Sequence, residues 1–203
     1  MADVLDLPRL VRGLPLAPPP ELSAALDAAS RCFAKHGITR TSMTDIGREL
    51  GVSRSGIYRQ LGSIERAVRL LLAREVHELV MGRLALVIDT ATGPETVVAV
   101  VEEVVRYTRR HPVLVKVLAD EPEIMGPFLV TDLPEVTAQV AAMVKPVLEV
   151  AMKAGLIARQ DAGALAGWLV RLVVVLVLDP PSQPIRPLLD QLLLPALDPN
   201  PGG

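Results

Sequence analysis

The stretch that most constrains this chain is the run from Met43 to Leu61, MTDIGRELGVSRSGIYRQL. It holds two apolar pairs, and the four-residue spacing within each pair places both members on one face of a helix. Between the pairs stands a glycine, which tolerates the left-handed dihedrals that commonly end a helix. The run therefore predicts two short helices joined by a tight turn. The pairs are Ile46 with Leu50 and Ile57 with Leu61, and the glycine is Gly51.

The helix starts and the helix crossing are also predicted by residue type. Thr44 can cap the first helix with its hydroxyl, and Asp45 is favourably placed near the positive helix start. Ser53 can cap the second helix in the same way. Gly47 has no side chain, so the second helix can cross close to the first, and Val52 fills the corner between them. This arrangement is a helix-turn-helix.

The outer surface of the second helix carries cations, hydroxyls and an amide, which suit phosphates and base edges. An ordinary helical hairpin with polar residues on its wet side would share some of these features. The joint agreement of the small residue, the turn glycine and the apolar positions favours DNA reading over that alternative. We expect near-base contacts from Arg54, Arg59 and Gln60, phosphate contacts from Thr41, Thr44, Ser53, Ser55 and Tyr58, and a close backbone approach at Ser55 and Gly56.

The distribution of charge agrees with this interpretation. The whole chain has a formal net charge of −2, so bulk charge does not make it a polyanion binder. Residues 31–69 nevertheless contain eight cations and only three acids. A basic segment in a weakly acidic chain is typical of a small DNA-binding head on a neutral or acidic body. The cations are Arg31, Lys35, Arg40, Arg48, Arg54, Arg59, Arg66 and Arg69, and the acids are Asp45, Glu49 and Glu65.

Helical periodicity with few strand signals predicts an all-α fold. Apolar residues make up 50% of the chain and aromatic residues only 2%, so the core should consist of Leu, Val and Ala. We expect helices over residues 21–36, 64–88, 95–110, 112–119, 133–154, 162–178 and 185–194, an irregular stretch at 120–127, and a kink or break at Pro146. The expected domains are a disordered arm at 1–20, a helix-turn-helix DNA-binding domain at 21–62, a regulatory ligand-binding and dimerisation domain at 63–194, and a disordered tail at 195–203.

The second half of the helix expected at 162–178 is apolar on nearly every face. A helix that is apolar all round must be buried all round. In a single small domain one face of this helix would remain exposed to solvent, so we expect a subunit interface there. In the arm, Arg9 and Arg12 could touch DNA or belong to a loose tail.

The chain shows no set of catalytic residues, and we do not expect an enzyme, a metal or a cofactor. Its histidines stand apart on separate expected helices and form no zinc motif. The acids Asp120, Glu121 and Glu123 are better interpreted as a solvated loop than as a metal site. The single cysteine, Cys32, excludes a disulfide within the chain, and no signal peptide or membrane-spanning run is evident, which suits a cytoplasmic protein. The histidines are His36, His77 and His111.

The segment from Glu21 to about Arg69 resembles the DNA-binding domain of the TetR (tetracycline-repressor) family. Two positions depart from that family, which usually has an aromatic residue at Leu61 and a lysine at Ile64. That lysine normally contacts the DNA backbone, and Arg66 and Arg40 are the candidates to replace it. The matching residues are Ala28, Phe33, Gly37, Thr41, Ile46, Gly47, Gly51, Val52, Ser53, Ile57, Tyr58 and Ser63.

The resemblance implies a ligand-responsive transcriptional regulator, most simply a repressor, that binds a roughly palindromic DNA operator as a homodimer or as two dimers. The homodimer would form through the last two long helices. The resemblance also implies an effector pocket in the body, and the scarcity of aromatic and charged residues there favours a hydrophobic small molecule. The alternative is a ligand-sensing or partner-binding dimer with weak or lost operator binding. The candidate pocket residues are Leu84, Val101, Val105, Tyr107, Met125, Phe128, Met143 and Trp168.

Overall fold

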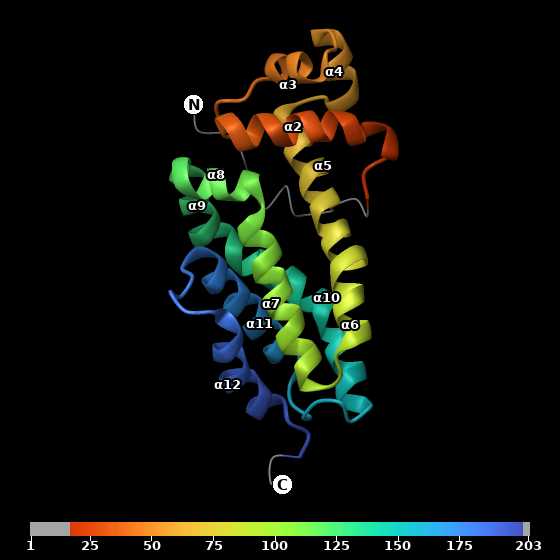
Figure 1. The fold of residues 1–203 in the computed structure, drawn as a ribbon, viewed down its shortest axis with the longest axis vertical. Helices are drawn as coiled ribbons and strands as arrows, with labels where there is room; N and C mark the ends of the chain where they lie inside the picture. Colours follow the sequence, from red (N-terminus) through yellow and green to blue (C-terminus); the bar gives the residue numbers. More distant parts are fainter. Residues whose placement is uncertain (1–16, 201–203) are drawn as a thin grey trace. The chain divides into compact units, whose positions relative to one another are not determined.

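The computed structural model describes residues 17–200, and all regular structure in that range is helical (Figure 1). The predicted all-α fold is therefore confirmed. Arg9 and Arg12 of the expected arm, and residues 201–203 of the expected tail, lie outside the described range. No helix within the described range is long and apolar enough to cross a bilayer.

The described chain forms two compact units, each with its own hydrophobic core. Unit 1 runs as far as Glu78 and also contains Arg110–Leu133. Unit 2 comprises Leu79–Arg109 and the chain from Pro134 onward. Unit 1 therefore holds the expected DNA-binding head, part of the helix that follows it, and a segment from the middle of the chain. The limits expected for the DNA-binding and regulatory domains, at residues 21–62 and 63–194, remain a prediction.

Unit 1 is built on α2 (Ser23–His36), which follows a 3-10 turn at Pro20–Leu22 and buries Leu26 and Phe33 completely. The helices α3 and α4 lie side by side against α2 (Figure 1). Cys32 is buried in this core, and burial raises the pKa of its thiol, which suits a packing residue rather than a reactive one. The other helical segments are α3 (Met43–Leu50), α4 (Arg54–Leu61), α5 (Ile64–His77), α8 (Pro112–Asp120), α9 (Pro122–Pro127) and a π-helical turn at Phe128–Asp132.

Two expectations for unit 1 are wrong. The stretch expected to be irregular contains α9, because Pro122 is tolerated at a helix start and the half-buried Ile124 and Met125 pack against the unit 1 core. The helix expected to run unbroken to residue 88 leaves α geometry at Glu78, where a π-helical segment, Glu78–Leu84, begins. Such segments inside helices often mark functional positions.

Unit 2 packs the valine face of α7 against the long helices that follow it. Val98, Val101 and Val105, at helical spacing, are buried. The helix α10 runs through the exposed Pro146 without being divided, so the break expected at that residue is wrong. The helices are α6 (Ala85–Thr90), α7 (Pro94–Arg110), α10 (Leu133–Lys153), α11 (Ala162–Leu178) and α12 (Ile185–Leu197).

A side-chain cap sets the start of α11, and a buried leucine sets the end of α12. The Asp161 side chain caps α11 by accepting the Gly163 and Ala164 N–H groups at 2.8 and 3.0 Å, and the predicted limits of this helix are confirmed. The helix α12 ends at Leu197, three residues later than predicted, because that side chain is fully buried. The disordered tail expected from residue 195 is therefore wrong for residues 195–197.

An ion cluster fastens α12 to α7. Arg186 on α12 pairs with Glu95 and, at 3.3 Å, with Glu102, both on α7, and with Asp190 one turn along its own helix at 2.8 Å. These carboxylates, Glu95 first, raise the pKa of the guanidinium. In such a network one ordered side chain serves several ion pairs, so the loss of side-chain entropy per pair is smaller. The network therefore stabilises the contact more than an isolated surface ion pair would.

Candidate nucleic-acid interface

The first helix of the predicted pair begins with a capping box. The Ser42 hydroxyl accepts the Asp45 N–H at 3.2 Å, and the Asp45 carboxylate accepts the Ser42 N–H at 3.0 Å. Thr44 was the expected cap, and this is wrong, because it is the second residue of α3, inside the helix boundary and on the exposed face. Hydrogen bonds from Ser42, the side-chain one first, hold the pKa of the Asp45 carboxyl below its usual range.

The turn between α3 and α4 follows the prediction. Gly51 ends α3 in the left-handed region, with φ at 77°. Ser53 caps α4 by accepting the Gly56 N–H at 3.1 Å. A Cβ placed on Gly47 would lie 3.1 Å from Ile57 Cγ2, so the helices cross as closely as the missing side chain allows. The helix-turn-helix is therefore confirmed as a closely packed pair.

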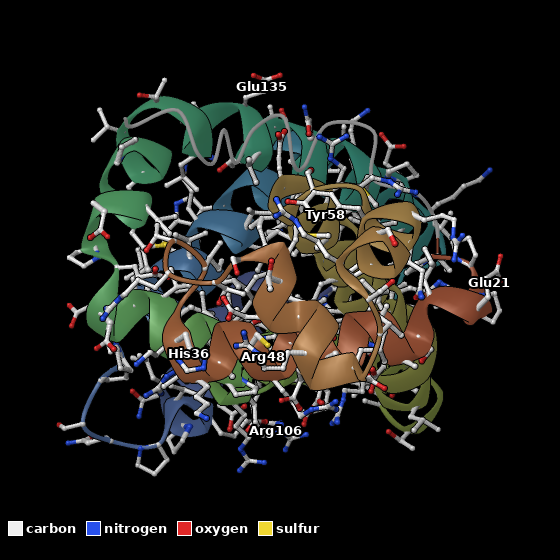
Figure 2. All side chains as sticks on the ribbon, turned by 90° about the horizontal axis from the view of Figure 1, so that it is seen from above. Glu21, His36, Arg48, Tyr58, Arg106 and Glu135 are labelled. Carbon is white, nitrogen blue, oxygen red and sulfur yellow. The ribbon has the colours of Figure 1, made fainter. Side chains whose placement is uncertain are left out.

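The outward face of this pair collects most of the predicted DNA contacts. Arg54 and Tyr58 lie one turn apart on α4, and the Arg54 guanidinium carbon stands 5.6 Å from the centre of the Tyr58 ring. Figure 2 labels Tyr58 on α4 and Arg48 on α3. The predicted residues with exposed side chains are Thr44, Ser53, Arg54, Ser55, Tyr58 and Arg59, and Gln60 is half-buried.

Two predicted contact residues lie elsewhere. Thr41 is 6% exposed, and its hydroxyl donates to the Gly37 carbonyl at 2.6 Å, so it ties the turn before α3 instead of offering itself to a phosphate. Gly56 is buried, and its Cβ position faces Ser53 Oγ at 3.3 Å. Its small size is therefore used inside the helix pair, not at the outer face.

Two further arginines lie in this region: Arg48, which was not among the predicted contacts, and Arg66, which was a candidate to replace the missing lysine. Arg48 has a side chain 76% exposed on α3 and pairs with Asp45 at 3.3 Å. Arg66 Nη1 donates to the Gln60 carbonyl at 3.1 Å, so it braces the end of α4, where helix carbonyls lack partners. One of the two candidates to replace the missing lysine is thus engaged within unit 1. A basic residue shortly after a helix end is the sequence signal for such a brace.

The candidate effector residues are divided between the two units. Val101 and Val105 are buried in the unit 2 core, whereas Met125 packs against the unit 1 core. Met143 and Trp168 are 70% and 60% exposed. Leu84 and Tyr107 are half-buried in unit 2, with the Arg83 guanidinium carbon 4.9 Å from the Tyr107 ring centre, and Phe128 begins the π-helical turn before α10. A shallow hollow of about 380 Å³ at the end of α10 contains none of these residues.

A capped, tightly crossed helix pair with a cationic and hydroxyl-rich outer face defines a helix-turn-helix DNA-binding protein. Residues 25–66 match the family model of the N-terminal domain of bacterial regulatory proteins of the tetR family. No curated protein sequence matches the chain. Residues 25–66 therefore carry a tetR-type helix-turn-helix DNA-binding domain.

Solved structures support the same fold along most of the chain. The ketosteroid transcriptional regulator KstR2 of Mycobacterium tuberculosis is 18% identical, with a TM-score of 0.54 over 91% of this chain and 99% of that one. The fatty acid degradation regulator FadR from Bacillus halodurans is 17% identical, with a TM-score of 0.61 over 88% and 95%. A TetR/AcrR-family regulator from Thermobifida fusca is 17% identical, with a TM-score of 0.61 over 86% and 96%. At these identities the likeness shows the fold alone.

Proposed function

We propose that the protein is a TetR-family transcriptional repressor that binds a roughly palindromic operator as a homodimer and is released by a hydrophobic small molecule. The observation that supports it best is the exposed polar face of α4 on a rigid helix pair. Each α4 enters one major groove, with half-site centres about 34–36 Å apart or a multiple of that distance. Arg54, Arg59 and Gln60 contact base edges. Phosphates are contacted by Thr44, Ser53, Ser55 and Tyr58.

Replacing Arg59 by alanine should weaken sequence-specific binding far more than nonspecific binding. A bidentate arginine contact to a base contributes about 1–3 kcal/mol of discrimination, so affinity for the preferred duplex should fall roughly 10- to 100-fold. The preferred duplex is the one that the wild-type protein selects from a random-sequence pool, and it is hereafter called the selected duplex. Fluorescence anisotropy at constant salt, with selected and scrambled duplexes, measures both affinities.

The matched control is Arg59→Lys, which keeps the charge and removes the planar fork. It should retain binding to the scrambled duplex and lose most of the preference. Equal losses on both duplexes for Arg59→Ala would show that Arg59 contacts only phosphate. If the wild-type protein selects no duplex at all, the alternative function, a ligand-sensing dimer without operator binding, is favoured instead.

The dimer is supported by apolar side chains that unit 2 leaves exposed. On α10, Met143, Val147 and Val150 recur at helical spacing, and on α11 Trp168 and Val175 lie two turns apart. Contiguous exposed apolar patches usually mark interaction sites. Because both helices carry such stripes, two copies can bury them against each other in a four-helix arrangement. Met143 and Trp168 are then dimer residues rather than effector contacts.

The effector class is supported by the apolar interior of unit 2, where α7 presents buried valines. The names of two similar structures, a ketosteroid regulator and a fatty acid degradation regulator, point to the same chemistry. Effector binding shifts the population toward a dimer whose α4 spacing no longer fits DNA. These steps act on chromosomal DNA, so the proposal places the protein in the cytoplasm.

Oleate and progesterone are suitable probes of this class. Either one, added to the complex with the selected duplex, should lower the measured DNA affinity by about 5- to 150-fold, the usual range of allosteric coupling. Acetate is the polar control and should change nothing. If neither probe shifts the affinity while acetate-sized anions do, the effector is not hydrophobic.

A further inference from the structure

Glu121 is a buried carboxylate that reaches across unit 1 to the turn before α3. It was expected in a solvated loop, and this is wrong, because its exposed fraction is 0%. Its oxygens accept the Ile38 N–H at 2.8 Å and the Thr39 N–H at 2.9 Å, and also the Thr39 hydroxyl. A buried carboxylate is costly unless such donors satisfy it. Glu121 is therefore hydrogen-bonded to a segment that lies 83 residues earlier in the chain.

The turn held by Glu121 sets the start of α3. Gly37 lies against the carboxylate so closely that a Cβ there would stand 2.6 Å from Oε1. The Thr41 hydroxyl closes the same turn onto the Gly37 carbonyl, and Ser42 then caps α3. A shift of the carboxylate must therefore move the first residues of α3.

A movement of α3 is transmitted to α4, because the two helices are packed in direct contact. The Gly47 Cβ position is 3.1 Å from Ile57 Cγ2 and 3.3 Å from the Val52 carbonyl oxygen. Protein interiors are close-packed with few voids, so a displacement of one helix is transmitted to the helix it contacts. The position of Glu121 is therefore linked, contact by contact, to the position of the DNA-reading helix.

The segment that carries Glu121 is also tied to unit 2. Residues 110–133 belong to unit 1, and both ends of the segment continue directly into unit 2, as α7 on one side and α10 on the other. These two helices carry the proposed effector and dimer surfaces. We infer that Glu121 is the positioning residue through which the state of α7 and α10 sets the geometry of α3 and α4. The inference rests on the proposed release of DNA by an effector in unit 2.

The test compares full-length wild type with Glu121→Gln by hydrogen–deuterium exchange, with and without the selected duplex. The amide of Gln faces backbone N–H donors with one oxygen fewer, so at least one hydrogen bond is lost. Without DNA, exchange in residues 43–61 should accelerate by roughly tenfold or more, while exchange in α11 stays unchanged. By reciprocity, DNA should alter exchange in α7 and α10 of the wild type, and this response should be lost in Glu121→Gln.

Val117→Ala is the matched control, because it loosens the buried packing of α8 and leaves the carboxylate in place. If Val117→Ala, at an equal loss of thermal stability, gives the same exchange pattern as Glu121→Gln, the carboxylate has only a structural role and the inference fails. If Glu121→Gln does not fold, Thr39→Val removes one donor alone and should produce a smaller change in the same peptides.

The outcomes separate the inference from the proposed function. A wild type that selects no duplex contradicts the proposed function, and the comparison without DNA still decides whether Glu121 positions α3 and α4. A wild type that binds the selected duplex with no response in α7 and α10, or with a response that survives in Glu121→Gln, overturns the coupling through Glu121.

Discussion

Gly37→Ala is expected to destabilise unit 1 by roughly 3–5 kcal/mol, enough to unfold a marginal domain. Gly37 has φ 85° and ψ 167°, a region that is essentially restricted to glycine and costs other residues about 1–3 kcal/mol. The new Cβ would also stand 2.6 Å from a Glu121 oxygen, so the buried carboxylate would lose its partners. Urea denaturation followed by circular dichroism measures the loss.

Gly51→Ala is the control for this change. Gly51 also has a positive φ, 77°, but nothing lies within 4 Å of its Cβ position. Alanine there should cost only the backbone strain of about 1–2 kcal/mol. A loss for Gly37→Ala no larger than that for Gly51→Ala would show that contact with Glu121 adds nothing to stability.

Val147→Asp is expected to convert the proposed dimer into monomers. The side chain is 63% exposed in the single chain and lies at the centre of the α10 stripe. In a twofold interface the substitution places a charge in both copies, and each buried unpaired charge costs several kcal/mol. The dimer dissociation constant, measured by sedimentation velocity, should rise roughly a hundredfold or more.

Val130→Asp serves as the matched control, since that valine is 81% exposed but lies in the π-helical turn of unit 1. It should leave the dissociation constant unchanged. DNA affinity should follow the oligomeric state, because two linked heads bind one operator far more tightly than separate heads. A Val147→Asp protein that remains dimeric would place the interface elsewhere on the chain.

Features decided by neighbouring residues could be predicted from the sequence. Gly51 ends α3, Ser53 caps α4, and α11 begins and ends at the residues predicted from the sequence. Each depends on the chemistry of a few adjacent positions. The exposed face of α4 followed in turn, because the spacing of Ile57 and Leu61 assigns the buried face of that helix.

Features decided by residues distant in the sequence could not be predicted. Asp120, Glu121 and Glu123 have the same composition as a solvated loop, and only the folded chain turns the middle one inward to Ile38 and Thr39. Thr41, Ser42 and Thr44 can all act as caps or phosphate ligands by residue type. Their separate roles depend on a turn whose shape is set by Gly37 and by Glu121.

The composition of unit 1 has a consequence for how the protein is made. Its core needs Val113 and Val117 from α8, and its turn before α3 needs Glu121. During synthesis, the DNA-reading helices therefore leave the ribosome well before the residues that complete their support. A nascent or truncated chain ending near residue 78 carries every predicted base contact, yet lacks part of its interior, so it is exposed to misfolding and proteolysis until the middle of the chain arrives.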